Sequence, residues 1–331
     1  MVKAFRWAAL LFGAACLLAL LALLGLRAAA AIRESAGAQA PVDGRLVATA
    51  TGSIFVQSSG PESGPPIVFV PGTAAWSSFW LSIARAMGNV GYRAIAIDLP
   101  PFGFSERSAS GAYTRVDQAE RLHALVVALG LTRPTIVGHS FGAGAVVEYA
   151  MRHPEEIGAM VLVDAALGLP DGEHPPAADP AFLRWALDRP GVAQALTAAT
   201  LVNAWATRPL LAGLLYRKEA ATSDRVEILT APFAREGTTA AYARWLPNLL
   251  LPETRAVSAT PANFAKLTVP TALIWGARDG VTPLSQGERL HTLVRGSTLE
   301  TIADAGHIPH IEDEQAFLSI LKARLALLTQ R

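Results

Sequence analysis

Ser140 lies in the segment Thr-Ile-Val-Gly-His-Ser-Phe-Gly, where a short apolar run leads into the pattern Gly-x-Ser-x-Gly. This pattern holds a serine at the tip of a sharp turn from a strand into a helix, in a strained backbone conformation. Gly138 and Gly142 lack side chains, so neighbouring backbone can come close to the turn. The flanking residues favour a strand before the serine and a helix after it. We therefore predict Ser140 as a nucleophile at the carboxyl end of a strand, where such sheets bind ligands.

A serine hydroxyl is a weak nucleophile at neutral pH and needs a nearby base. An imidazole can take the proton and return it, and a carboxylate can fix the tautomer of that imidazole. Asp279 and His307 follow Ser140 along the chain, and each comes after a predicted strand. Asp164 also follows a predicted strand and is the alternative acid.

Four segments, in this order along the chain, resemble the α/β-hydrolase superfamily, specifically its lid-bearing branch of esterases, lipases and related hydrolases. They are Asp98–Ser105, the segment around Ser140, Trp275–Pro283 and Ala305–Glu312. The first is similar to the branch's Asp-x-Pro-Gly-x-Gly-x-Ser loop, with Pro101 in place of the usual Gly. The resemblance covers about residues 45–328.

The resemblance implies that Ser140 is the nucleophile, that His307 is the general base and then the acid, and that Asp279 orients the imidazolium. It also implies an oxyanion hole made by the backbone N–H groups of Phe141 and Thr73. Relatives usually carry His-Gly where this chain has Pro71 and Gly72. A backbone donor does not depend on that histidine side chain, so we expect the hole to be retained.

Other polar residues near these segments are predicted to be structural. His139 precedes the nucleophile, His310 follows His307 by three residues, and Asp98 ends a predicted strand. We expect His139 and His310 to pack or brace loops, and Asp98 to hold its own loop.

The intervening sequence predicts the α/β-hydrolase fold, a mostly parallel sheet flanked by helices. Expected strands are 46–51, 53–57, 67–70, 94–97, 135–137, 160–163, 271–275 and 299–302, and expected helices are 115–129, 141–152 and 312–328. Residues 167–266 show helix-like stretches, many prolines and no strand pattern, and are predicted to be a helical lid, or cap. Residues 46–166 and 267–331 would then form the hydrolase core.

The N-terminus predicts a transmembrane helix. Trp7 to Leu26 is a run of 20 residues without a charge, which as a helix spans roughly 30 Å, the thickness of a bilayer core. We interpret residues 1–33 as a membrane anchor, or alternatively a cleaved signal segment, and residues 34–45 as a tether. Lys3 and Arg6 before the run weakly place the catalytic domain outside the cytoplasm. Deletion of residues 1–33 is expected to leave a soluble, active enzyme.

Composition excludes several functions. The net charge is +1 and no basic block occurs, so no nucleic-acid partner is expected. The one cysteine, Cys16, allows no intrachain disulfide. We find no metal-binding or nucleotide-binding motif and expect neither a metal nor a cofactor.

The leading function is hydrolysis of a small apolar carboxylic ester, as by a carboxylesterase or lipase, through an acyl-enzyme. The lid is apolar and holds Trp185, Trp205, Phe233 and Trp245, which favours an acyl or aromatic substrate. Short p-nitrophenyl esters should be cleaved, with activity lost as His307 becomes protonated at acidic pH. The alternatives are a C–C bond hydrolase, although these commonly carry Asn at the position of His139, a hydrolase-fold small-molecule receptor with slow turnover, and an inactive scaffold.

Overall fold

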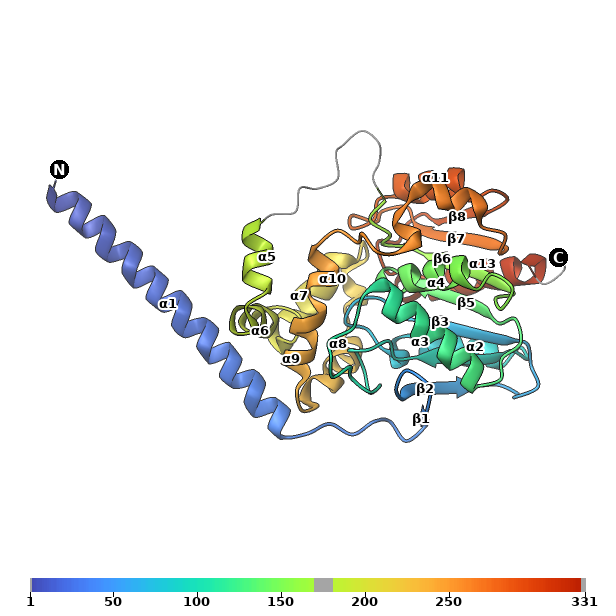
Figure 1. Cartoon of the computed structure of the whole chain (residues 1–331), viewed down its shortest axis with the longest axis horizontal. Helices are drawn as coiled ribbons and strands as arrows, with labels where there is room; N and C mark the ends of the chain where they lie inside the picture. Colours follow the sequence, from blue (N-terminus) through green and yellow to red (C-terminus); the bar gives the residue numbers. More distant parts are fainter. Residues whose placement is uncertain (1, 170–180, 329–331) are drawn as a thin grey trace.

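The computed structural model describes residues 2–169 and 181–328. The expected cap lies within this range except for residues 170–180, which fall outside the described residues. Figure 1 shows three parts: a long N-terminal helix, a group of cap helices, and a sheet with helices on both faces. The cap helices lie between the N-terminal helix and the sheet.

The sheet has eight strands in the order β1-β2-β4-β3-β5-β6-β7-β8. The strands are β1 Gly44–Val47, β2 Ile54–Ser59, β3 Pro66–Val70, β4 Arg93–Ile97, β5 Thr135–His139, β6 Ala159–Val163, β7 Thr271–Gly276 and β8 Thr298–Ile302. β1 and β2 form a hairpin that pairs antiparallel with β4, and all other neighbours are parallel. The predicted sheet is therefore confirmed, with the ends of the two hairpin strands displaced by one to four residues.

The central strands are buried on both faces, which explains their continuous apolar runs. Along β3, Val68 and Val70 contribute to one apolar cluster, while Ile67 and Phe69 contribute to the other. This alternation follows from the two-residue period of a strand. Helices α3 Arg115–Ala128, α4 Phe141–Arg152 and α11 Leu284–Leu293 cover the first face, and α2 Leu81–Gly88 and α13 Glu314–Leu328 cover the second.

The cap is inserted between β6 and β7. It comprises α5 Ala181–Leu187, α6 Pro190–Ala199, α7 Ala204–Leu214, α8 Ser223–Thr230, α9 Thr238–Trp245 and α10 Pro247–Leu250, with the short 3-10 helices η2 Lys218–Ala220, η3 Ala231–Ala234, η4 Val257–Ala259 and η5 Pro261–Lys266. No strand occurs among the described residues of 167–266. The division of the chain into anchor, tether, core and cap remains our prediction.

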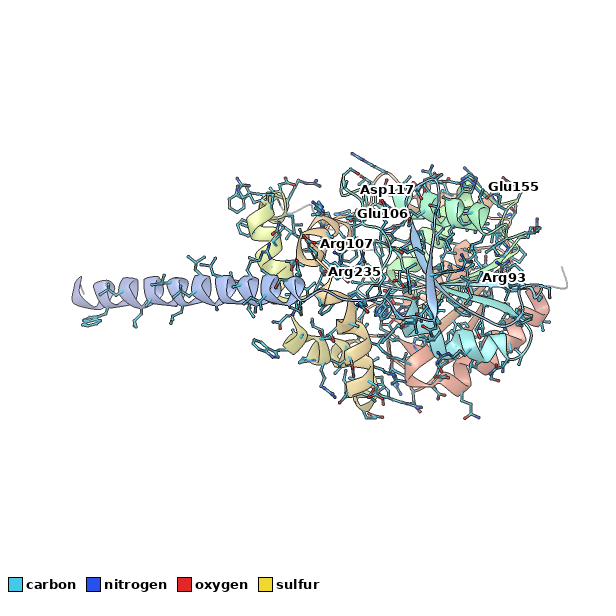
Figure 2. All side chains as sticks on the ribbon, turned by 90° about the horizontal axis from the view of Figure 1, so that it is seen from below. Arg93, Glu106, Arg107, Asp117, Glu155 and Arg235 are labelled. Carbon is cyan, nitrogen blue, oxygen red and sulfur yellow. The ribbon has the colours of Figure 1, made fainter. Side chains whose placement is uncertain are left out.

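Two arginines join the cap to the core, and Figure 2 labels both at the border between these parts. Arg107 of the core donates to the Glu236 carbonyl and to the Thr238 hydroxyl of the cap, at 2.5 and 2.6 Å. Arg235 of the cap donates to the carbonyl of Ser105 at 3.1 Å and also to that of Gly103. The cap is thus fastened to the loop that follows β4.

The N-terminal helix α1 runs unbroken over Val2–Ser35. By length and composition it is suited to cross a membrane, because Gly13–Ser35 reaches a mean hydropathy of 2.3. Only 6% of its apolar window is buried, which distinguishes it from a core helix. The tether expected over 34–45 is shorter than we predicted, since Glu34 and Ser35 are helical and β1 begins at Gly44. Arg33 and Glu34 in this last turn of α1 contact the cap.

Candidate active site

Ser140 lies at the turn between β5 and α4. Its φ of 49° and ψ of −122° fall outside the usual regions for a residue with a side chain. The turn is tight enough to require glycine on both sides. A Cβ on Gly138 would collide with Val146, and one on Gly142 with the Pro71 carbonyl. The Gly-x-Ser-x-Gly pattern thus reflects close backbone packing around a strained serine.

The structure brings together the three residues that the sequence singles out. His307 Nε2 lies 2.8 Å from Ser140 Oγ, and His307 Nδ1 lies 2.8 Å from Asp279 Oδ2. All three residues are buried. With a neutral imidazole, the serine hydroxyl donates to Nε2 and the Nδ1–H donates to the carboxylate. This arrangement can move a proton from the serine to the histidine while the acid holds the ring.

Asp279 is fixed by the loop that follows β7. Its Oδ1 accepts hydrogen bonds from the backbone of Val281 and Thr282, at 2.7 and 3.0 Å. Its Oδ2 accepts a further one from the Thr282 hydroxyl at 2.6 Å. Burial alone would raise the pKa of Asp279, but the hydrogen bond and charge of His307, with the Thr282 hydroxyl, lower it to about 2. Asp279 is therefore the anion beside the imidazole at neutral pH.

Asp164, the alternative acid, has a different state. Its Oδ1 accepts a hydrogen bond from the Gly276 backbone at 2.9 Å, and the described hydrogen bonds pair His307 with Asp279 instead. Complete burial, and then the negative charge of Asp279, raise the pKa of Asp164 well above its usual value. Both effects favour the protonated form of Asp164, in contrast to Asp279.

His139 braces the backbone of the site. Its Nε2 lies 2.7 Å from the carbonyl oxygen of His307, so this nitrogen carries the proton and donates. Burial, and then the positive charge of His307, lower the pKa of His139 to about 3. The neutral ring therefore holds the histidine loop in place, as the sequence interpretation expects.

His310 and Asp98 also occupy structural positions. The His310 ring stacks on Trp80 with centroids 3.8 Å apart, and burial holds its pKa well below the usual value. Asp98 accepts hydrogen bonds from the backbone of Ser77 and Phe104, at 2.7 and 2.5 Å. Burial raises the pKa of Asp98 to about 6. Asp98 therefore ties two loops beside the site.

The two expected oxyanion donors lie beside the nucleophile. Thr73 and Phe141 line the same cavity as Ser140. Phe141 begins α4, and the first N–H groups of a helix have no partner within it. A Cβ on Gly72 would meet the His139 ring and the Ser140 side chain, so the loop before Thr73 passes directly over the nucleophile. Their role as donors remains a proposal.

The cavity over Ser140 has a volume of about 550 Å³, within the range of small-molecule sites. Core loops form its floor, and the cap supplies an apolar wall of Leu201, Leu210, Leu211, Leu214, Leu229 and Phe233. Among the aromatic residues singled out in the cap, Phe233 lines the cavity. Trp245 is buried, whereas Trp185 and Trp205 are 48% and 81% exposed. Leu210, Leu211 and Leu214 of α7 make most of the wall, and Leu229 of α8 and Leu201 before α7 complete it. No local sequence pattern shows that these three segments meet.

Asp164, Asp279 and His307 bring their donor atoms within 4.8 Å of one another, a spacing that a metal ion could use. The His307 nitrogen that would bind it is already hydrogen-bonded to Asp279. The geometry therefore favours proton transfer over metal binding at this cluster.

The family model for the alpha/beta hydrolase fold matches residues 65–314. The chain belongs to the α/β-hydrolase fold family. The match covers every element that positions Ser140, Asp279 and His307.

Comparison with known members places this α/β-hydrolase among enzymes of several activities. It is 26% identical to a 2-hydroxymuconate semialdehyde hydrolase from Pseudomonas putida, over 83% of this chain and 86% of that protein. An esterase from Exiguobacterium antarcticum matches with a TM-score of 0.68 and 20% identity, over 85% of this chain and 98% of the other. A bacterial membrane phospholipase A matches with a TM-score of 0.70 and 23% identity, over 97% of this chain and 99% of that chain. The last similarity extends to nearly the whole chain, and so beyond the hydrolase core.

Proposed function

We propose that this hydrolase cleaves a carboxylic ester of an apolar substrate through an acyl-enzyme on Ser140. The observation that carries the proposal is the pair of 2.8 Å contacts that link Ser140 Oγ through His307 to Asp279. The floor of a cavity of about 550 Å³ presents this serine to a ligand. The apolar cap wall favours an acyl group over a charged one.

The reaction follows from the positions of these atoms. Ser140 Oγ attacks the acyl carbon while its proton passes to His307 Nε2, and Asp279 stabilises the imidazolium. The backbone N–H groups of Thr73 and Phe141 receive the negative charge that develops on the carbonyl oxygen. The imidazolium then protonates the departing alcohol, and water, activated by the same histidine, hydrolyses the acyl-enzyme.

The proposed location is a membrane, with α1 as a single-pass anchor and the catalytic domain outside the cytoplasm. The length and apolar character of α1 support the span. The charges before the span, Lys3 and Arg6, support the orientation. Secretion after signal cleavage is the alternative, and sequencing the N-terminus of the mature protein distinguishes the two.

C–C bond hydrolysis is the second candidate function, since a relative is named for a semialdehyde hydrolase. The observation that favours it here is Arg115, whose side chain lines the cavity and could pair with a substrate carboxylate. Arg115 is itself held by the Leu167 carbonyl at 2.9 Å and by the Ser258 hydroxyl at 3.2 Å. Glu253 lines the same cavity and offsets the charge of Arg115.

An ester panel and a C–C substrate, both assayed with the full-length protein in detergent, test these functions against each other. We expect hydrolysis of p-nitrophenyl esters and labelling of Ser140 by a fluorophosphonate probe. Ser140→Ala should abolish both, whereas Ser110→Ala, at an exposed serine before α3, should change neither. Full ester activity in Ser140→Ala would refute the mechanism. Turnover of a 2-hydroxy-6-oxo-dienoate in preference to every ester would favour the C–C reaction.

A further inference from the structure

One edge of the cap exposes an unusual set of apolar side chains. They are Phe182 and Trp185 on α5, Val192 and Leu196 on α6, and Trp205 on α7, which we call the cap edge. Phe182 is 77% exposed and Trp205 is 81% exposed. Large apolar groups gathered on a surface mark a site of interaction, and none of these five residues lines the catalytic cavity.

The cap edge lies beside the end of the apolar run in α1. That run ends at Leu26, and the next residue, Arg27, donates to the Gln194 side chain on α6. Gln194 is two positions from both Val192 and Leu196, so it faces α1 while these two exposed side chains share the opposite face of α6. Because a run of this length matches a bilayer core, a spanning α1 brings α6 to the level where lipid tails give way to headgroups.

Trp205 is placed at the same level by an independent observation. It borders a small hollow of about 60 Å³ together with Leu26, Ala29 and Ala30 of α1. Tryptophan favours the membrane–water interface, where its ring is partly apolar and its N–H is hydrated. Figures 1 and 2 show α5 and α6 at the end of the folded part from which α1 leaves.

The junction between α1 and the cap fixes this placement. Arg33 donates to the Val202 carbonyl and lies over the Phe233 ring at 5.5 Å. Glu34 accepts a hydrogen bond from the Thr239 backbone at 2.8 Å and one from its hydroxyl. With α6, η3 and α9 all packed on α1, the cap cannot move away from the membrane without breaking these contacts.

We propose that the cap edge lies in the headgroup layer of the bilayer that α1 spans, as a second membrane contact of the same chain. The inference rests on the proposed membrane insertion of α1. Its consequence is that the catalytic cavity, whose wall includes Leu210 on the same helix as Trp205, is held at the membrane surface.

The test uses the full-length protein in vesicles of phosphatidylcholine and phosphatidylglycerol. In a Cys16→Ala background, Trp205→Cys is labelled with the environment-sensitive fluorophore NBD. Val127→Cys on α3, 64% exposed and on the core, is the matched control. A third protein carries the label at the native Cys16 and reports whether α1 is inserted. Quenching is measured with iodide in the water and with spin labels on the lipid headgroups or on the mid-chain carbons.

We expect headgroup spin labels to quench the probe at position 205 and iodide to quench it weakly, with the reverse at position 127. Failure of mid-chain spin labels to quench at Cys16 would refute the anchor itself. Quenching at Cys16 with iodide-accessible fluorescence at position 205 would overturn the cap-edge proposal alone. Shielding of position 205 from both iodide and headgroup labels would indicate a protein–protein contact there and would overturn it equally.

Discussion

At the scale of single residues, the two buried carboxyl groups near His307 have pKa values shifted in opposite directions. His307 and Thr282 lower the pKa of Asp279, whereas burial and then the charge of Asp279 raise the pKa of Asp164. We expect Asp279→Asn to lower kcat on the order of 10⁴-fold, since the ring loses the acid that fixes its tautomer. Asp164→Asn, the matched control, should retain kcat within a few-fold, because an amide replaces an acid whose protonated form is favoured. Steady-state kinetics on a p-nitrophenyl ester measure both, and an equal loss in the two variants would contradict the assignment.

The raised pKa of Asp164 predicts how the free energy of unfolding depends on pH. The unfolded chain releases the Asp164 proton near its ordinary pKa of about 3.9, whereas the folded protein retains it to much higher pH. This contribution is fully present below about pH 4 and is lost as pH rises toward the folded pKa. Asp164→Asn has no proton to release. In thermal melts, the Tm of Asp164→Asn relative to that of the parent protein should therefore be higher at pH 8 than at pH 5. The same Tm difference at both pH values would refute the raised pKa of Asp164.

Local pattern was sufficient to single out the three residues that the structure brings together, but not their protonation states. The motif around Ser140 and the two later loops single out the serine, the acid and the histidine because tight turns demand particular residue types. The raised pKa of Asp164 depends on complete burial next to a charge on another loop. The donor nitrogen of His139 depends on a carbonyl 168 residues away. The residues on either side of Asp164 and His139 in the sequence do not predict these long-range contacts.

At the scale of elements, the last turns of α1 belong to the cap as well as to the anchor. Arg33 contacts Val202 and Phe233. Phe233 lines the catalytic cavity, and Val202 follows the cavity residue Leu201. Removing only the apolar turns, residues 1–24, keeps these contacts, whereas removing residues 1–35 breaks them. The expectation that residues 1–33 are dispensable thus needs refinement, since that deletion removes Arg33 and retains Glu34.

We expect deletion of residues 1–24 to leave the Tm and KM of the full-length enzyme unchanged. Deletion of residues 1–35 should lower the Tm by several degrees and raise the KM. A loss of one kcal/mol lowers Tm by about 2–4 °C in a domain of this size. Differential scanning fluorimetry and ester kinetics, with both truncations in the same detergent, provide the comparison. Identical Tm and KM values would show that the junction contributes nothing to the cap.

At the scale of the whole molecule, the order of elements was predictable and their long-range contacts were not. Alternating apolar runs and helices indicate a parallel sheet, and the stretch between β6 and β7, whose sequence shows no strand pattern, indicates the cap. The contact between α1 and α6 joins residues 167 positions apart. An apolar helix at the N-terminus predicts a membrane span, but its sequence does not say which surface it meets on leaving the membrane.

This arrangement predicts different responses to esters in water and esters in a membrane. Trp205→Asp places a charge where the cap edge meets headgroups, but the residue lies outside the catalytic cavity. In proteoliposomes, we expect hydrolysis of a long-chain ester embedded in the bilayer to fall several-fold, because a carboxylate at position 205 opposes close contact between the cap edge and the lipid that supplies the ester. Hydrolysis of soluble p-nitrophenyl acetate should not change. Val127→Asp introduces the same charge at an exposed position of α3, which lies on the sheet and not beside α1 (Figure 1), and should affect neither substrate. Equal rates of hydrolysis of the embedded ester by Trp205→Asp and Val127→Asp would show that the cap edge does not contribute to binding of substrate from the bilayer.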